Sequence, residues 1–274
     1  MAQLHLRERT LDAPLGVFVM GVINATKDSF WEESRGGIER AQRLIAEGAD
    51  ILDIGGESSR PGSAYVSADE ETARIIPLIQ AVRRISDIPI SVDTRKASVM
   101  RAALEAGADI LNDISALEDD AALPELAAQA EIPVILMHKR GTPKTMQQNT
   151  AYRDVFSEVD RYLTARAAFA EQCGIKKEKI FVDPGIGFGK DAAGNAALIH
   201  RCGQLCGGKY PVVMALSRKS FIGDVTGRIA AERLAGTITA NLVAVQNGAK
   251  IIRAHDVKEA VDSLKVLRYI SLHT

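Results

Sequence analysis

The chain has 274 residues, of which 46% are hydrophobic and 25% are charged, and its formal net charge is −1. This is ordinary globular composition, and the balanced charge excludes a basic field for nucleic acid or an acidic tail. No run approaches the ~18 consecutive apolar residues of a membrane span. We therefore expect neither a nucleic-acid partner nor a membrane partner, and an anionic substrate would need a local cluster of Arg and Lys.

The chain begins with a polar segment. It lacks the apolar stretch of ~7–15 residues that a signal peptide contains. We predict separately that residues 1–15 are an N-terminal extension of the domain. Three cysteines cannot all pair, and none lies in a CxxC motif. We predict a cytoplasmic protein with reduced thiols.

Short apolar runs then alternate with amphipathic helical patterns along the chain. The runs lie within 17–24, 47–54, 88–93, 106–113, 132–138, 179–185, 211–217 and 247–254. The helical patterns lie near 36–47, 69–85, 95–106, 121–130, 152–172, 193–206, 229–247 and 256–269. Alternation of this kind predicts a parallel sheet, and eight units favour closure into a (β/α)8 TIM barrel.

The alternative architecture is a doubly wound open sheet. That fold would place a glycine-rich phosphate loop after its first strand, and no GxGxxG motif occurs there. No linker or low-complexity stretch divides the chain. We therefore predict an α/β protein with a single domain over residues 1–274.

A weak repeat marks three helix-to-strand junctions, namely EGADILDI (47–54), AGADILND (106–113) and NGAKIIRA (247–254). The glycine of each segment is predicted to end a helix in the left-handed conformation: Gly48, Gly107 and Gly248. Five residues further on stand Asp53, Asn112 and Arg253. We expect these three side chains to point the same way from their strands.

Nearly every predicted strand ends in a polar residue. In chain order these are Asn24, Asp53, Asp93, Asn112 with Asp113, His138, Asp183, Ser217 with Arg218 and Lys219, and Arg253 with His255 and Asp256. A single residue of this kind is more often a helix cap than a catalytic group. Capping does not explain Lys219, Arg253 and His255, and barrel enzymes hold their active sites at this rim.

The charges at the rim form two sets. Arg60, Lys219, Arg253 and His255 suit phosphate oxygens, because Arg offers a fork of donors and Lys a point charge. The other set offers carboxylate and amide groups for a polar ring: Asp93, Asn112 and Asp183. The sequence therefore predicts a phosphorylated small-molecule substrate with a polar heterocycle.

Seven segments in order along residues 16–260 resemble the signature blocks of the dihydropteroate synthase family: GVINATKDSF, DIGGESSRPGS, SVDTRK with GADILNDIS, VILMHKRGTPKTMQ, DPGIGFGK, SRKSFIG and IIRAHDV. The resemblance implies a (β/α)8 barrel, a homodimer and a transferase of folate biosynthesis. Such an enzyme condenses 6-hydroxymethyl-7,8-dihydropterin pyrophosphate with p-aminobenzoate to give 7,8-dihydropteroate and pyrophosphate. It is also a sulfonamide target.

The resemblance also implies residue roles. Catalysis would fall to Asp93, Lys219, Arg253 and His255, and the pterin ring to Asp93, Asn112, Asp183, Lys219 and Arg253. The pyrophosphate would be held by Asn24, Arg60, Arg253 and His255, with Asn24 as a ligand of Mg²⁺. The p-aminobenzoate site would contain Phe30, Ser59, Arg60, Pro61, Phe188, Ser217 and Lys219. Two departures from the family pattern, Lys27 and Ser59, fall at the p-aminobenzoate end.

Three other functions remain open at this point. A pterin-binding methyltransferase using methyltetrahydrofolate would share the Asp and Asn residues, but it has no need of Arg60, Lys219 and His255 for pyrophosphate. An inactive pterin-binding relic would be expected to have lost polar site residues, which are all present here. A phosphosugar aldolase or isomerase would need a Schiff-base lysine at a strand end, for which Lys219 is the candidate.

Overall fold

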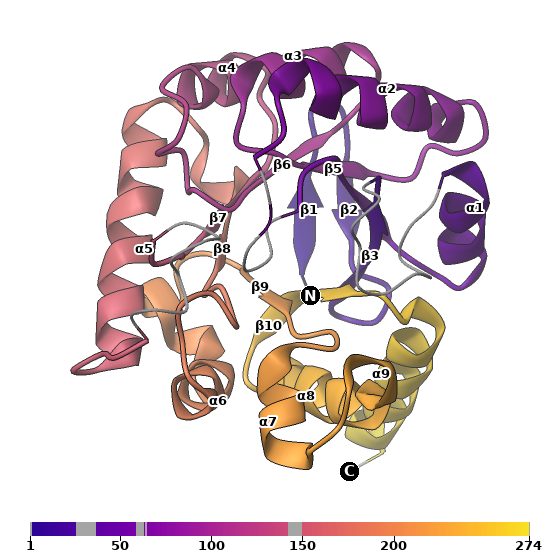
Figure 1. The fold of residues 1–274 in the computed structure, drawn as a ribbon. Helices are drawn as coiled ribbons and strands as arrows, with labels where there is room; N and C mark the ends of the chain where they lie inside the picture. Colours follow the sequence, from indigo (N-terminus) through magenta and orange to yellow (C-terminus); the bar gives the residue numbers. More distant parts are fainter. Residues whose placement is uncertain (1, 26–36, 59–62, 64, 142–149, 274) are drawn as a thin grey trace.

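The computed structural model describes residues 2–25, 37–58, 63, 65–141 and 150–273. Eight parallel strands close into a barrel in the order β10-β3-β4-β5-β6-β7-β8-β9, which confirms the predicted TIM barrel (Figure 1). The strands are β3 (Phe18–Asn24), β4 (Ile51–Gly55), β5 (Ile90–Asp93), β6 (Ile110–Asp113), β7 (Val134–Met137), β8 (Ile180–Asp183), β9 (Val212–Ala215) and β10 (Ala249–Ala254). Each lies within a predicted apolar run, apart from a one-residue overhang of β4, because strands covered by helices are apolar on both faces.

Helices surround the barrel, as Figure 1 shows. They are α1 (Ile38–Ala46), α2 (Ala68–Arg83), α3 (Ala97–Glu105), α4 (Leu123–Gln129), α5 (Val155–Gln172), α6 (Ala192–His200), α7 (Ser220–Thr226), α8 (Leu234–Gln246) and α9 (Val257–Leu272). The repeat glycines Gly48, Gly107 and Gly248 follow α1, α3 and α8 with φ of 95°, 106° and 105°. Their predicted left-handed conformation is therefore confirmed.

Two helix predictions need correction. The helix expected near 193–206 ends at His200, and η4 (Cys202–Gly208) follows with a non-helical backbone at Leu205 and Cys206. Glycines weaken helices, and a Cβ at Gly203 would lie 2.4 Å from the Asn247 carbonyl oxygen. The helix expected near 229–247 begins only at Leu234, after a separate turn, η5 (Ala230–Glu232).

The N-terminal residues form an antiparallel hairpin of β1 (Gln3–His5) and β2 (Thr10–Asp12), drawn in indigo in Figure 1. Its buried Leu4 and Leu6 pack against side chains near the amino ends of the barrel strands, including Phe18 and Phe181. The hairpin therefore covers the end of the barrel opposite the carboxyl rim. That residues 1–15 are an extension of a single domain stays a prediction.

In the part of the chain that the structure describes, no helix combines the length and apolarity needed to cross a membrane.

Candidate active site

The barrel interior changes from apolar to polar toward the carboxyl ends of its strands. Side chains alternate along a strand, so residues two apart face the same way. The apolar layer contains Phe18, Met20, Ile51, Ile110, Ile135, Phe181, Val213 and Ile251. Four of these apolar residues are followed, two positions later on the same strand, by a polar residue: Asp53, Asn112, Asp183 and Arg253. The hydrophobic layer thus supports a polar layer at the rim, where barrel enzymes bind substrates.

Arg253 joins the polar layer across the barrel. Its Nε donates to Asp53 Oδ2 at 2.6 Å, and its Nη2 donates to Asp93 Oδ2 at 3.1 Å. Asn112 Nδ2 lies 3.3 and 3.4 Å from the two oxygens of Asp53. The expectation that the three repeat residues point the same way is therefore confirmed, because Arg253 and Asn112 share the carboxylate of Asp53.

Burial shifts the titration of these groups. It raises the pKa of Asp93 to about 7, because desolvation, reinforced by Asp53, outweighs the attraction of Arg253. Burial likewise raises the pKa of Asp183, although the Gly185 N–H bonds its carboxylate at 2.7 Å. Desolvation opposes the charge of Arg253, but Asp53 and Asp93 raise its pKa overall. The guanidinium is thus a fixed cation between carboxylates.

The glycine-rich segment after β8 is anchored by Lys190, a residue that was not predicted from the sequence. The buried ammonium lies 3.0 Å from His138 Nδ1 and 2.9 Å from the carbonyl oxygens of both Gly185 and Phe188. Burial lowers the pKa of Lys190 to about 7 and, with the Lys190 charge, that of His138 to about 3. A neutral imidazole accepts this bond. The signal was a lysine inside the glycine-rich DPGIGFGK segment directly after a strand.

The same segment needs glycine at one position for a steric reason. Gly185 has φ of 67°, and a Cβ there would lie 1.9 Å from the carbonyl oxygen of His138. Phe188, three residues on, lies under Lys219, whose Nζ is 4.4 Å from the ring centroid. The predicted p-aminobenzoate residue and the predicted catalytic lysine are therefore neighbours in a cation–π contact.

Two loops at the rim are locked together by a second ion pair. Arg218 Nε and Nη2 donate to the two oxygens of Asp256 at 2.9 and 2.8 Å. Beside this pair, Ser217 Oγ lies 3.2 Å from the His255 backbone N and 3.0 Å from its Nδ1. Arg218 and Asp256 are thus structural, while their neighbours Ser217, Lys219 and His255 are brought to the site.

Asp113, in contrast, holds a turn and takes no part in the site. Its carboxylate accepts from the Ser115 N–H and Oγ–H at 2.7 and 2.6 Å and from the Leu117 N–H at 2.7 Å. These bonds hold a turn in which Ala116 and Leu117 have φ of 52° and 66°. Among the polar residues that end β6, only Asn112 therefore joins the site.

Comparison with known proteins decides the family. The sequence profile described as pterin binding enzyme matches residues 20–255. The dihydropteroate synthase of Escherichia coli K12 is 44% identical over 257 residues, which are 91% of this chain and 90% of that protein. The chain belongs to the dihydropteroate synthase family.

Solved structures of family members agree with this membership. A Yersinia pestis dihydropteroate synthase in a sulfonamide drug complex superposes with a TM-score of 0.92 at 38% identity, covering 98% of this chain and 99% of that one. A Burkholderia cenocepacia dihydropteroate synthase complexed with 7,8-dihydropteroate gives 0.89 at 41% identity, covering 99% and 97%. The predicted resemblance to this family is confirmed.

Not every predicted site residue lies within the part of the chain that the structure describes. Asn24 ends β3, next to Gly55 of β4 in the register, and so lies at the carboxyl rim. Four predicted residues lie outside the described residues: Phe30, Ser59, Arg60 and Pro61. The two departures from the family pattern, Lys27 and Ser59, also lie outside them.

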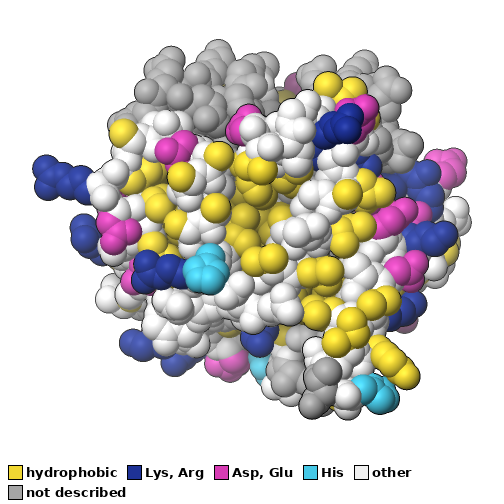
Figure 2. All heavy atoms as spheres, turned by 90° about the horizontal axis from the view of Figure 1, so that it is seen from below, with side chains coloured by type: hydrophobic (Ala, Val, Ile, Leu, Met, Phe, Trp, Pro, Cys, Tyr) yellow, Lys and Arg dark blue, Asp and Glu magenta, His cyan; other side chains and the backbone are white. Residues whose placement is uncertain are grey.

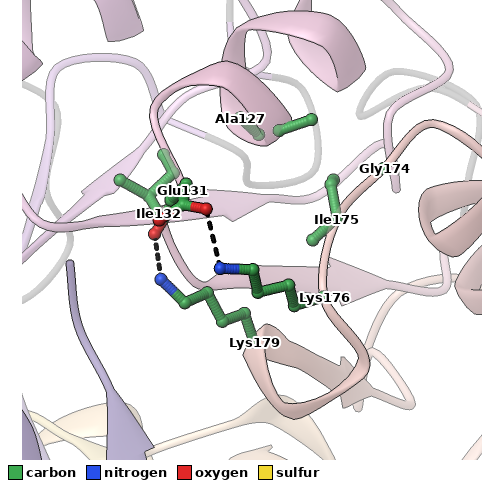
Figure 3. Close-up of a pocket in the computed structure, with 8 residues that line it drawn as sticks. Ala127, Glu131, Ile132, Gly174, Ile175, Lys176 and Lys179 are labelled. Atoms are coloured by element: carbon green, nitrogen blue, oxygen red, sulfur yellow. Dashed lines mark hydrogen bonds and ion pairs between the residues drawn. The ribbon is translucent and has the colours of Figure 1, made fainter.

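A hollow elsewhere in the chain is too small to be a substrate site. Figure 3 shows Lys176 and Lys179 reaching toward Glu131 beside it. Lys176 Nζ lies 2.7 Å from Glu131 Oε1, and Lys179 Nζ contacts the Glu131 carbonyl oxygen. The hollow, of about 10 Å³, lies at the amino ends of β7 and β8 and holds at most one water. It is remote from the carboxyl rim.

Proposed function

We propose that this chain condenses 6-hydroxymethyl-7,8-dihydropterin pyrophosphate with p-aminobenzoate, giving 7,8-dihydropteroate and pyrophosphate. The polar layer at the carboxyl rim is the observation that carries the proposal. It places carboxylates, an amide and a guanidinium within one buried cluster, on a barrel that is 44% identical to the Escherichia coli synthase.

The pterin half of the substrate fits this layer. Asn112 and Asp183 offer an amide and a carboxylate to the hydrogen-bonding edge of the ring, and both are at least nine-tenths buried. Arg253 presents a planar guanidinium whose orientation two carboxylates fix, so it can stack on the ring. Lys219, on the neighbouring loop, completes the pterin set that we propose.

The pyrophosphate half needs cations and donors at the rim. We assign this role to Asn24, Arg253 and His255, together with Arg60 of the second loop. Arg253 lies near the carboxyl end of β10, and His255 directly follows this strand and is held by Ser217 on the loop after β9. Barrels commonly bind phosphate there.

Asn24 suits a magnesium ion carried by the substrate. Mg²⁺ keeps several waters and takes one or two protein oxygens plus phosphate oxygens, and the Asn24 amide oxygen is such a donor. Among the described residues there is no group of three or more His, Cys, Asp or Glu arranged for a metal. With Asn24 as a ligand, such an ion would stabilise the charge on the departing pyrophosphate.

Asp93 is the residue that we assign to the bond-breaking step. The pterin CH₂–O bond breaks with its electron pair on the pyrophosphate, and the remaining cation is delocalised into the ring. A carboxylate preorganised beside that ring stabilises the cation as it forms. The amine of p-aminobenzoate is unprotonated at neutral pH, so it attacks the methylene carbon without a strong base and then loses one proton.

The p-aminobenzoate site would lie where Phe188, Ser217 and Lys219 meet. Lys219 contacts the Phe188 ring, and Ser217 is buried beside His255. We place Phe30, Ser59, Arg60 and Pro61 in the same site from the family resemblance. A sulfonamide, which mimics p-aminobenzoate, would compete there.

We further propose that the enzyme is a homodimer that works as one domain in the cytoplasm. Hydrophobic side chains gather on the face that Figure 2 shows, over the helices at the bottom of Figure 1. The exposed apolar residues of α7 to α9 and of the turn between α7 and η5 are Val225, Ile229, Val243, Val266, Tyr269, Ile270 and Leu272. Free thiols at Cys173, Cys202 and Cys206 agree with a reducing compartment.

The test uses purified protein, Mg²⁺ and both substrates, with dihydropteroate and pyrophosphate measured separately. We expect product that requires both substrates and decreases when Mg²⁺ is chelated. Release of pyrophosphate without consumption of p-aminobenzoate would support only the pterin half of the proposed reaction. Methyl transfer from methyltetrahydrofolate in place of condensation would favour the methyltransferase, and pterin binding without any turnover would favour the inactive relic.

A further inference from the structure

Asp53 is the most deeply buried member of the polar layer. It lies in the middle of β4, between Val22 of β3 and Ser91 of β5 in the register, and its exposure is 0%. The side chain of Asp93 is 14% exposed and that of Arg253 is 20% exposed. Asp53 therefore lies beneath the surface that a substrate could touch.

The Asp53 carboxylate bonds two of the residues proposed to hold the pterin. It accepts from Arg253 Nε at 2.6 Å and faces Asn112 Nδ2 at 3.3 and 3.4 Å. These partners come from β10 and β6, neither of which is hydrogen-bonded to β4. One buried anion thus fixes two side chains that the backbone does not hold relative to each other.

The contact to Arg253 also limits what that guanidinium can do. Arg253 donates to Asp53 through its Nε, and it donates to Asp93 through its Nη2 at 3.1 Å. Without Asp53, both edges of the fork could turn onto Asp93, which is the usual bidentate arrangement. The Asp53 contact therefore keeps Asp93 from being fully occupied by the arginine.

We propose that Asp53 is a positioning residue of the pterin site, a buried carboxylate that orients Arg253 and Asn112 and leaves Asp93 available to the substrate. This inference rests on the proposed function of the site. Asp53 acts through its two partners and does not touch the pterin. Its effect should therefore fall on the pterin half of the reaction and leave the p-aminobenzoate half unchanged.

The test compares Asp53→Asn with Asp50→Asn. Asparagine preserves the shape of residue 53 but removes the charge. Asp50, three residues earlier, is a partly buried carboxylate of the same segment, and it accepts from the Val19 N–H at 2.8 Å near the amino end of the barrel. For Asp53→Asn we expect KM for the pterin pyrophosphate to rise about tenfold or more, with KM for p-aminobenzoate within about twofold. Asp50→Asn should leave both constants near those of the wild type.

A pH profile separates positioning from general damage to the fold. Asp93 contacts Arg253 and is within electrostatic reach of the carboxylates of Asp53, Glu71 and Asp113, and the negative charge of Asp53 helps to raise the Asp93 pKa. Removing that charge should shift the acidic limb of kcat/KM to lower pH in Asp53→Asn. The inference would be overturned if folded Asp53→Asn kept the wild-type KM for the pterin pyrophosphate and the wild-type acidic limb of kcat/KM. It would also be overturned if the KM values for the pterin pyrophosphate and for p-aminobenzoate changed equally.

Binding measurements keep this inference distinct from the proposed function. If the wild type formed no dihydropteroate, the proposed function would fail. The affinity of each protein for the dihydropterin pyrophosphate, measured by calorimetry, would then decide the role of Asp53. We expect it to weaken about tenfold or more in Asp53→Asn and to remain unchanged in Asp50→Asn. Equal affinities in all three proteins would reject the positioning role.

Discussion

At the scale of single residues, the chemistry of Asp93 depends strongly on its surroundings. Burial raises its pKa to about 7, while Arg253 opposes the shift. A carboxylate that stabilises a cation must be ionised, and the ionised fraction of Asp93 grows as pH rises through its pKa. Burial of Asp93 therefore opposes the ionisation that its proposed catalytic role requires near neutral pH.

We predict that kcat/KM of the wild type rises with pH along a limb with its midpoint near 7. Asp93→Asn should lose this limb and should lower kcat by about 100-fold or more, since a preorganised charge is removed. Steady-state rates between pH 5.5 and 8.5 test both statements. Titration of the substrates themselves would remain visible in the variant, which therefore serves as the control. A limb that persists in Asp93→Asn contradicts the assignment.

The same titration affects stability with a definite sign. Between the unfolded value near 3.8 and the folded value near 7, native Asp93 retains a proton that the unfolded chain has lost. Stability from this group is complete at low pH and is lost as pH rises through about 7. The free energy of unfolding of Asp93→Asn should lack this decrease.

At the scale of elements, the loops after β9 and β10 are the parts whose arrangement depends on one ion pair. The side chains of Arg218 and Asp256 are 4% and 12% exposed, and Arg218 Nη1 also donates to the Ala230 and Ala231 carbonyls at 2.9 and 2.7 Å. These bonds tie η5 to both loops. Ser217, Lys219 and His255 flank the pair, so their positions depend on it.

We predict that Asp256→Asn lowers the free energy of unfolding by about 3–5 kcal/mol, because it leaves a buried guanidinium without its counter-charge. Glu232→Gln is the matched control. It breaks the exposed Arg228–Glu232 pair at 3.6 Å and should change stability by about 0.5 kcal/mol or less. Urea unfolding at one protein concentration measures both. A similar loss of stability in the two variants would show that burial of the Arg218–Asp256 pair does not increase its contribution to stability.

The strands were predictable because local signals agree. Each run is apolar on successive residues, and glycines at 48, 107 and 248 fix three helix ends. The helix near 193–206 was wrong because its end depends on a tertiary contact of Gly203 with the Asn247 carbonyl. A short helix such as α7, of seven residues, has too few turns for a periodic pattern.

The site was partly predictable for the same reason. The shared spacing from glycine to Asp53, Asn112 and Arg253 predicted a common direction, and their hydrogen bonds confirm it. The spacing could not reveal that Arg253 reaches Asp93, since β10 and β5 meet only across a closed barrel. Lys190 was missed because its partners are a distant histidine and two carbonyl oxygens.

At the scale of the whole molecule, α8 is unusual for an outer helix because it carries no charged residue (LAGTITANLVAVQ). Thr237, Asn241 and Ala244 face the barrel and are buried, while Val243 points outward and is 37% exposed. A helix that is uncharged on all sides is typical of one covered on both sides. Exposed Val266 and Tyr269 of the adjoining α9 extend the same apolar face, which Figure 2 shows.

We predict that a second copy of the chain covers this face, so that the wild type sediments with about twice its 29.5 kDa mass. Val243→Glu should shift the protein toward the monomer, because a charge in the centre of an apolar interface is desolvated without a partner. Ile85→Glu is the control, since Ile85 is 48% exposed and follows α2, on the other side of the barrel (Figure 1). It should leave the mass unchanged. Sedimentation velocity over a range of concentrations distinguishes the two variants, and a wild type that remains monomeric throughout would refute the predicted dimer.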